Sequence, residues 1–205
     1  MRKRRAILLL AAVVVVAAAV FWLMWPLFPP EWFGIEPGPK PRPAEWAAPL
    51  DRPGLSNLHR VSEDLYRGAQ PTAEGMRQLK AMGIKTVVNL RELHSDRDEI
   101  GDTGLAYEDI RMTPWDPDDD EVVRFLQIVT DKARTPVFVH CQRGSDRTGL
   151  MCAIYRMVVE HWGREEAVAE MTQGGFGYAG LWKPLVDYLR EADLDQLRRR
   201  AGLTP

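Results

Sequence analysis

The stretch VFVHCQRGSDRTGLMCAIYRMVVEHW, from Val137 to Trp162, constrains the fold of this chain most strongly. It opens with a short apolar run typical of a buried strand, and it ends with a long apolar run that predicts a buried helix. One short loop of polar and small residues joins the two. A buried strand that runs directly into a helix is typical of an α/β fold with a parallel sheet. The loop then lies at the carboxyl edge of the sheet, where ligands bind in such folds.

Apolar periodicity predicts the same alternation of strands and helices in the rest of the chain. Thr72 is a suitable N-cap for the first helix, and Gly83 is a suitable end for it. The predicted fold class is therefore α/β, with a mainly parallel central sheet flanked by helices. We expect an opening strand and turn within 59–70, strands at 84–90, 106–112 and 136–141, and helices at 72–83, 118–133, from 144–147 onward, 164–172 and 181–200.

Charge and cysteine content exclude several classes of protein. The 205 residues carry a formal net charge of -2, and four of the 27 basic residues fall within positions 2–5. The remainder has 23 basic and 29 acidic residues, a net charge of -6, which argues against a nucleic-acid partner. Two cysteines are too few for a disulfide framework, and the four histidines lack metal-ligand spacing, so we predict no metal.

An apolar segment near the N-terminus predicts export of the domain that follows it. Residues 6–25 form an uncharged apolar run that is long enough to cross a bilayer as a helix, and the basic flank at 1–5 is expected to stay in the cytoplasm. We expect a single-pass signal-anchor in the inner membrane at 6–25, a Pro-rich linker at 26–54, and a folded domain at 55–205 on the periplasmic side. A cleaved signal peptide is the alternative, and it exports the domain equally.

The loop after the strand at 136–141 has the composition of an anion site. The first N–H groups of a helix lack partners and carry partial positive charge. Gly144 and Gly149 let the backbone approach an oxyanion closely, and Arg147 supplies a planar fork that can bind two oxygens. A phosphate monoester matches this arrangement best. The predicted phosphate-binding loop comprises Gln142, Arg143, Gly144, Ser145, Asp146 and Arg147.

Cys141 stands at the start of this loop, in the positive field of the same helix. Helix N-termini and basic neighbours lower a thiol pKa from about 8.5 to about 3.5–7.5, so we expect a thiolate at Cys141. A thiolate that faces a bound phosphate can attack phosphorus, form a phosphocysteine and expel the alcohol. Thr148 is expected to donate its hydroxyl to the sulfur, and His140 to orient the loop through backbone contacts.

The leaving alcohol needs a proton donor from another loop at the same edge. The acidic segment TPWDPDDDE, at 113–121, follows the strand at 106–112. Asp118, Asp119 and Asp120 have an ordinary role as cap and first-turn acids of the next helix. Asp116 lies before that helix, where Pro117 keeps it extended. We therefore favour Asp116 as general acid and then base, with Asp118 in reserve.

Two further residues have alternative interpretations. Gln173, in TQGGFGY, either positions the hydrolytic water or belongs to a helix end whose glycines form a turn. Cys152, on the apolar helix, is either a buried structural residue or a resolving partner for oxidised Cys141. The structural interpretation is favoured for both residues.

The residues HCQRGSDRTG at 140–149 match the signature HCxxGxxRTG. With LYRGAQP, TVVNLRE, EMTQGGFGY and the N-terminal segment, the chain resembles cysteine-dependent protein tyrosine phosphatases of the dual-specificity type, most of all the bacterial exported ones. This resemblance covers roughly residues 55–190. It implies a compact α/β phosphatase fold, a phosphocysteine intermediate and no metal or cofactor. Cys141 is then the nucleophile, Arg147 the phosphate binder and an upstream Asp the acid, with 55–205 as the catalytic domain.

The substrate is less constrained than the reaction. The loop has one further basic residue, Arg143, whose charge Asp146 offsets, and this favours phosphotyrosine in a protein. Inositol polyphosphates and phosphoinositides are the alternative substrates, although relatives that use them usually have more basic loops. A non-catalytic phosphate-binding module is disfavoured because nucleophile, arginine and candidate acid are all present. Rhodanese-type sulfurtransferases are disfavoured because their loop is typically one residue shorter and lacks a paired acid.

Overall fold

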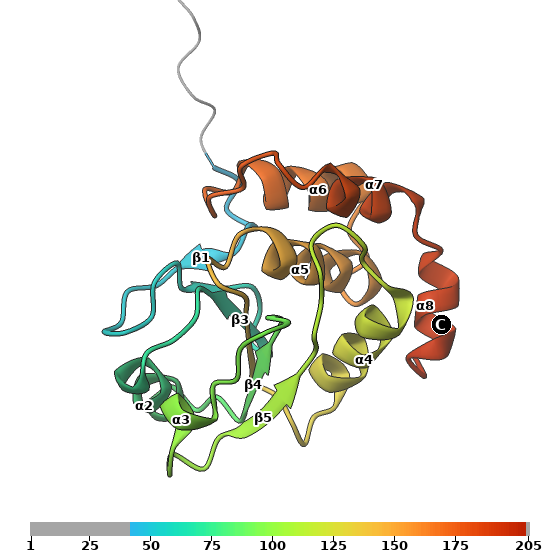
Figure 1. Ribbon diagram of the computed structural model, residues 1–205. Helices are drawn as coiled ribbons and strands as arrows, with labels where there is room; N and C mark the ends of the chain where they lie inside the picture. The colour runs from blue at the N-terminus through green and yellow to red at the C-terminus, as the bar shows by residue number, and fades with distance from the viewer. Residues whose placement is uncertain (1–41, 204–205) are drawn as a thin grey trace, which may run out of the picture. The chain divides into compact units, whose positions relative to one another are not determined.

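A computed structural model of the protein describes residues 42–203. The compact unit begins at Pro43, and a six-stranded sheet with the strand order β1-β2-β3-β6-β4-β5 forms its centre (Figure 1). The strands are β1 (Ala48–Pro49), β2 (His59–Arg60), β3 (Leu65–Gly68), β4 (Thr86–Asn89), β5 (Ala106–Asp109) and β6 (Val137–His140).

Four neighbouring strands of this sheet run parallel. β6 lies between β3 and β4, with Leu65 and Thr86 both opposite Val137, and β5 pairs with the outer side of β4. β1 and β2 extend the sheet beside β3 as antiparallel strands. The predicted mainly parallel sheet is therefore confirmed. The carboxyl ends of β3, β4, β5 and β6 meet at one edge, so the loops that follow these strands share that edge.

Helices cover both faces of the sheet. In Figure 1, α2 and α3 lie on one side of it, and α5 lies on the other side with the remaining helices around it. Side chains alternate along β6 accordingly, because Phe138 packs into the core under α2 while Val137 and Val139 pack toward α5. The helices are α2 (Ala73–Ala81), α3 (Arg97–Ile100), α4 (Asp119–Thr130), α5 (Asp146–Val158), α6 (Arg164–Gln173), α7 (Lys183–Glu191) and α8 (Leu194–Arg200).

Local sequence signals explain most of the element boundaries. The hydroxyl of Thr72 accepts a hydrogen bond from the N–H of Gly75, so Thr72 caps α2 as predicted. The helix predicted at 181–200 is instead two helices. Ala192 leaves the helical conformation. The Asp193 carboxylate then caps a new helix by accepting hydrogen bonds from the N–H groups of Asp195 and Gln196. The opening segment 59–70 likewise contains two short strands, and the four-residue α3 was not predicted.

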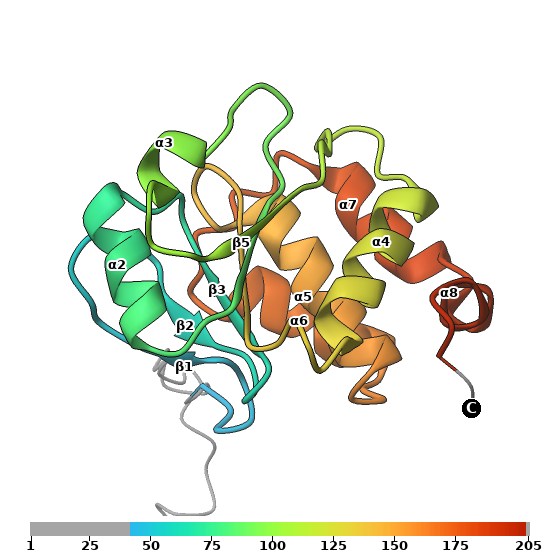
Figure 2. The same ribbon diagram turned by 90° about the horizontal axis from the view of Figure 1, so that it is seen from below.

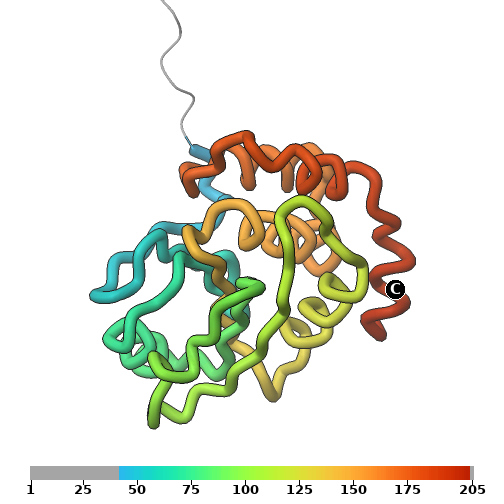
Figure 3. The backbone as a smooth tube through the Cα atoms, viewed as in Figure 1, coloured from blue at the N-terminus to red at the C-terminus, as the bar shows by residue number. Residues whose placement is uncertain are grey.

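Residues just before β1 are held in the core by a buried ion pair. Arg156 on α5 binds Glu170 on α6 through two hydrogen bonds of 2.8 Å. Glu170 also accepts from the N–H of Ala47 at 2.6 Å, and Arg156 donates to the carbonyl of Glu45. Figure 3 shows this first part of the described chain passing beside α5 and α6. Residues 43–54 of the expected linker therefore lie within the compact unit.

The predicted fold class included an N-terminal transmembrane helix, and this part is corrected. None of the helices within residues 42–203 combines the length and apolar character needed to cross a membrane. The longest of them, α5, has 13 residues and is therefore about 20 Å long, against about 30 Å for a hydrocarbon core. The segment 6–25, on which that expectation rested, lies outside the described residues, as does the basic flank 1–5.

Candidate active site

The loop predicted to bind phosphate joins β6 to α5 and lies against the end of β3. Gly144 has a φ of 71°, a left-handed conformation that favours glycine. A Cβ atom on Gly144 would stand 2.4 Å from the carbonyl of Gly68, so the two backbones are in direct contact. The end of β3 therefore fixes the path of the loop.

Cys141, directly after β6, is buried, with 3% of its surface exposed. Burial opposes ionisation of the thiol, but the Thr148 hydroxyl, the N–H groups of Thr148 and Gly144, and the charge of Arg147 outweigh it. The pKa of Cys141 therefore lies below its ordinary value. Thr148 is fully buried within the first turn of α5, and its hydroxyl is among the groups that lower the thiol pKa. These contacts make Cys141 a candidate nucleophile.

Arg147, in the first turn of α5, is anchored at the ends of two other strands. Its Nη1 donates to the carbonyl oxygens of Leu90 and Met112, both at 3.2 Å. Leu90 directly follows β4, and Met112 lies in the loop after β5. A guanidinium has five N–H donors, so the opposite side of its fork can bind phosphate oxygens.

His140 connects the loop to a buried acid on the segment before α3. Its Nε2 donates to Asp96 at 2.7 Å, and its Nδ1 lies 3.2 Å from the carbonyl oxygen of Cys141. His140 and Asp96 are both fully buried. The role of His140 in orienting the loop stays a prediction, and its link to Asp96 was not predicted, since the two lie 44 positions apart.

The polar residues of the loop differ in exposure. Gln142 and Arg143 are exposed, whereas Ser145 and Asp146 are buried. Arg143 Nη2 lies 3.6 Å from the Asp146 carboxylate, so the charge of Arg143 is partly offset, as expected. Burial raises the pKa of Asp146 despite this basic neighbour.

The two candidate acids follow β5 and occupy different environments. Asp118 is the N-cap of α4: its carboxylate accepts from the N–H of Asp120 at 2.6 Å, within a capping box completed by Glu121. Asp116 is exposed, and the hydroxyl of Thr113 donates to its backbone carbonyl at 3.3 Å. Figure 2 shows this loop beside the loop that leads into α7.

Trp115 and Trp182 join these two loops. Their ring centres lie 6.1 Å apart. Trp115 nevertheless keeps 59% of its surface exposed. The acid loop thus carries an exposed aromatic ring next to Asp116.

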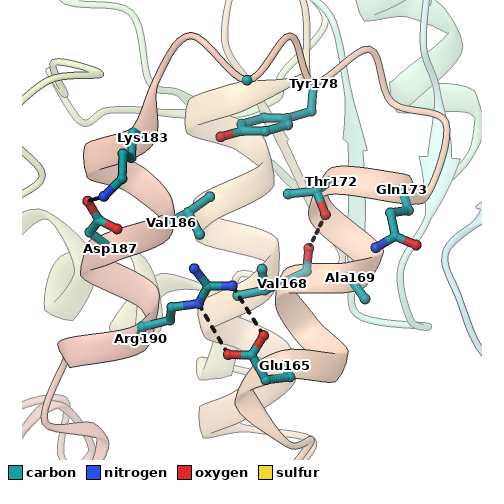
Figure 4. Close-up of a pocket in the computed structure, with 11 residues that line it drawn as sticks. Glu165, Val168, Ala169, Thr172, Gln173, Tyr178, Lys183, Val186, Asp187 and Arg190 are labelled. Carbon is teal, nitrogen blue, oxygen red and sulfur yellow. Dashed lines mark hydrogen bonds and ion pairs between the residues drawn. The ribbon is translucent and has the colours of Figure 1, made fainter.

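Gln173 is the last residue of α6, and its side chain is exposed. It borders a hollow of about 360 Å³ between α6 and α7, across from Lys183 (Figure 4). Gly174 ends the helix, and Gly175 and Gly177 have positive φ values, which agrees with the helix-end interpretation of the glycines. Cys152 is a free cysteine, and burial raises its pKa to about 11.

Two residues that sequence reasoning missed, both outside the loop, bind its backbone carbonyls. Arg67 of β3 donates from Nη2 to the carbonyl of Gly144 at 2.6 Å. Asn57 donates from Nδ2 to the carbonyls of Arg143, at 3.0 Å, and Phe176, at 2.9 Å. An arginine between Leu65 and Gly68 in a buried strand was the one available signal.

One group of possible metal ligands lies near the site. Within the described part of the chain, ligand atoms of His94, Asp96 and Glu99 come within 4.8 Å of one another. His94 already contacts Gln70, and Asp96 holds His140. The prediction that the protein needs no metal stays a prediction.

A thiol of lowered pKa at the N-terminus of a helix, with an arginine in the same loop, is the arrangement expected of cysteine-dependent phosphatases. The family model described as DSP-PTPase phosphatase fused to NAD+ kinase matches residues 54–180. The chain belongs to this family of dual-specificity tyrosine phosphatases, and the protein is a phosphatase.

Individual relatives agree with this assignment. The dual specificity protein phosphatase TpbA of Pseudomonas aeruginosa (strain UCBPP-PA14) is 37% identical over 159 residues, which are 77% of this chain and 72% of that protein. A crystal structure of a Cys-to-Ser variant of P. aeruginosa TpbA in complex with pTyr has a TM-score of 0.71 and 34% identity, covering 80% of this chain and 99% of that one. The inositol diphosphatase DSP3 of Arabidopsis thaliana is 24% identical over 156 residues, 70% of this chain and 73% of that protein.

Proposed function

We propose that the protein hydrolyses phosphotyrosine in proteins through a phosphocysteine formed on Cys141. The observation that carries the proposal is the environment of Cys141, where a hydroxyl, two backbone N–H groups and Arg147 together lower the thiol pKa. A thiolate is the nucleophilic form of cysteine, and the same N–H groups and guanidinium attract a phosphate. Nucleophile and phosphate site therefore coincide in one loop.

The first step transfers the phosphoryl group to sulfur. The Cys141 thiolate forms a bond to phosphorus while the ester P–O bond breaks, and Asp116 gives its proton to the departing phenolate oxygen. Asp116 is preferred to Asp118 because the Asp118 carboxylate is engaged as a helix cap. Arg147 binds two of the phosphate oxygens and stabilises the charge that develops on them.

The second step releases phosphate and restores the enzyme. A water molecule attacks phosphorus, Asp116 takes up one of its protons, and the P–S bond breaks to return the thiolate. Thr148 steadies the departing sulfur with its hydroxyl, the same contact that lowers the thiol pKa in the free enzyme. Gln173 has no contact in the described structure that favours a role in placing this water, since its side chain lies on the border of the hollow between α6 and α7.

Phosphotyrosine is favoured as substrate by the rim of the site and by one relative. Arg143 is offset by Asp146, so the loop has little surplus charge for a highly phosphorylated ligand. Trp115 offers an exposed aromatic surface beside Asp116. TpbA, which this chain resembles, has been crystallised with pTyr. Inositol phosphates are the second candidate, because another relative is an inositol diphosphatase.

A side-by-side substrate profile tests this choice. Phosphotyrosyl, phosphoseryl and phosphothreonyl peptides are compared with inositol polyphosphates and inositol diphosphates at equal concentration, with Cys141→Ser as the inactive control. We expect the largest kcat/KM on phosphotyrosyl peptides. A larger kcat/KM on an inositol diphosphate would contradict the proposed substrate but leave the phosphocysteine mechanism standing.

We also propose that the catalytic domain acts outside the cytoplasm. The proposal is supported by the sequence at 1–25, a basic flank followed by an uncharged apolar run. Fractionation of a bacterium that expresses the full chain tests it, with protease protection of the catalytic domain as the measurement. Protection that persists after the outer membrane is opened would contradict export.

A further inference from the structure

Arg67 occupies a position where a charged side chain is unusual. It lies on β3, paired in parallel with Val139 of β6, and only 1% of its surface is exposed. Side chains alternate along a strand, so Arg67 shares a face with Leu65, which packs in the same core as Cys141. The guanidinium is therefore directed to the side of the sheet that carries the phosphate-binding loop and α5.

The contacts of Arg67 join this loop to the segment between α6 and α7. Its Nη2 donates to the carbonyl of Gly144 at 2.6 Å, and its guanidinium carbon lies 3.7 Å from the centre of the Phe176 ring. Asn57, in a left-handed conformation with φ 56°, holds the preceding carbonyl, that of Arg143, together with the carbonyl of Phe176. Two consecutive carbonyls of the loop are thus held by side chains outside it.

Holding these carbonyls also directs the loop's N–H groups. In a trans peptide the C=O of one residue points opposite to the N–H of the next. The bond from Asn57 to Arg143 O therefore directs the N–H of Gly144, and the bond from Arg67 to Gly144 O directs the N–H of Ser145. The N–H of Gly144 is one of the groups that lower the pKa of Cys141, as this geometry requires.

The charge balance around Arg67 favours an anion in the site. None of the ion pairs among the described residues involves Arg67, and its Nε has no hydrogen-bond partner there. Burial and the positive charge of Arg156 lower the pKa of Arg67, whereas the anionic forms of Cys152, Glu170 and Cys141 raise it. A buried guanidinium without a bonded carboxylate gains most from an anion close by. The thiolate of Cys141 and a bound phosphate supply one.

We propose that Arg67 is a positioning residue of the phosphatase: through the carbonyl of Gly144 it turns the loop's N–H groups toward the phosphate site, and its charge stabilises the Cys141 thiolate. This inference rests on the proposed role of Cys141 as nucleophile. It assigns to β3 a part of the catalytic apparatus that the loop signature does not contain.

The test is the pH dependence of Cys141 alkylation by iodoacetamide, with the modified residue identified by peptide mass. In Arg67→Met the midpoint is expected to rise by about one pH unit, so that alkylation below both midpoints slows about tenfold. The acidic limb of kcat/KM against pH should move by the same amount. Arg67→Lys restores the charge and should return the midpoint most of the way to the wild-type value. A wild-type midpoint in Arg67→Met would overturn the proposal.

Arg156→Met is the matched control, since Arg156 is also a buried arginine but binds Glu170. It should lower Tm and leave the alkylation midpoint unchanged, and an equal shift in both variants would reduce Arg67 to a structural role. If Arg67→Met does not fold, Arg67→Gln decides, because an amide keeps a donor for the carbonyl of Gly144 but carries no charge. It must raise the alkylation midpoint, and an unchanged midpoint overturns the proposal. Hydrolysis by Cys141→Ser is measured in parallel, so failure of the proposed nucleophile is recognised separately.

Discussion

At the scale of single residues, Asp116 and Asp118 show how two nearby carboxylates acquire different tasks. The Asp118 carboxylate accepts the N–H of Asp120 and so satisfies one of the free donors at the start of α4. The side chain of Asp116 lies exposed on the loop before the helix, next to Trp115. A general acid must come within hydrogen-bond distance of the leaving oxygen of the substrate. The Asp118 carboxylate would first have to give up its bond to the N–H of Asp120.

Exchange of each carboxylate for an amide separates these tasks. Asp116→Asn should lower kcat/KM, which reports the first step alone, by about 10²–10⁴-fold on an ester with a poor leaving group, because the departing oxygen then receives no proton. The loss should be much smaller on p-nitrophenyl phosphate, whose leaving group needs little protonation. Asp118→Asn should keep both activity and Tm, because asparagine caps a helix about as well as aspartate. A larger loss in Asp118→Asn would reverse the assignment.

The residue scale is also where sequence reasoning reached furthest and then stopped. Cys141, Arg147 and Thr148 could be assigned because one loop contains them, and a loop signature is local. Arg67 and Asn57 lie on other segments, and their bonds to the loop depend on the parallel pairing of β3 with β6. A strand sequence does not show which of its residues will face a loop more than 70 positions away.

At the scale of elements, the start of α4 gathers several acids. Glu121 completes the capping box, and its pKa is raised from 4.5 to about 7, first by burial and then by the carboxylates of Asp118, Asp116 and Glu92, against a hydrogen bond from the Asp118 N–H. The folded protein therefore binds more protons at Glu121 than the unfolded chain does between pH 4.5 and about 7. The contribution of Glu121 to the free energy of unfolding therefore falls as pH rises through that window.

Glu121→Gln should remove this loss while keeping the cap, since glutamine also completes a capping box. The Tm difference between Glu121→Gln and wild type should rise in favour of the variant from pH 4.5 to about 7. Glu74→Gln on α2 is the opposite control. Hydrogen bonds from Gln78 and Arg77 lower the pKa of Glu74, so the Tm of Glu74→Gln should fall further below that of wild type as pH rises. A Tm difference for Glu121→Gln that stays flat would contradict the raised pKa.

Periodicity predicted the long elements better than the short ones. The strands β4 and β6 and the helices α2, α4 and α6 follow clear patterns of apolar residues. β1 and β2 have two residues each, too few to show alternation. The break between α7 and α8 depends on Asp193 as N-cap of α8. In the sequence alone, an aspartate at this position is equally consistent with the surface of one continuous helix.

At the scale of the whole molecule, the compact unit includes residues whose composition suggested a linker. Residues 43–54 are rich in proline, yet Trp46 and Ala47 are buried and the chain enters the sheet at β1. The buried pair of Arg156 and Glu170 binds this segment at two backbone groups. Proline content shows where regular hydrogen bonding is absent, but it does not show whether the chain is packed.

Two shortened chains test this boundary. A chain that begins at Pro43 should keep the free energy of unfolding of the catalytic domain. A chain that begins at Leu55 lacks the hydrogen bond from the N–H of Ala47 to Glu170 and the buried surface of Trp46. We expect its free energy of unfolding to be lower by at least about 3 kcal/mol. Urea denaturation provides the measurement. Equal free energies of unfolding for the two chains would mean that residues 43–54 are dispensable.

The central claim is that Cys141 carries the phosphoryl group during turnover. Asp116→Asn protein is mixed with p-nitrophenyl phosphate, whose leaving group needs little protonation, so that loss of the base for the second step lets the phosphocysteine accumulate. The mixture is quenched in acid during steady turnover, and the mass of the peptide that contains Cys141 is measured. We expect the added mass of one phosphoryl group on Cys141, and none in a Cys141→Ser sample treated in the same way. Continued hydrolysis with no phosphoryl group on Cys141, or with the group on another residue, would contradict the account.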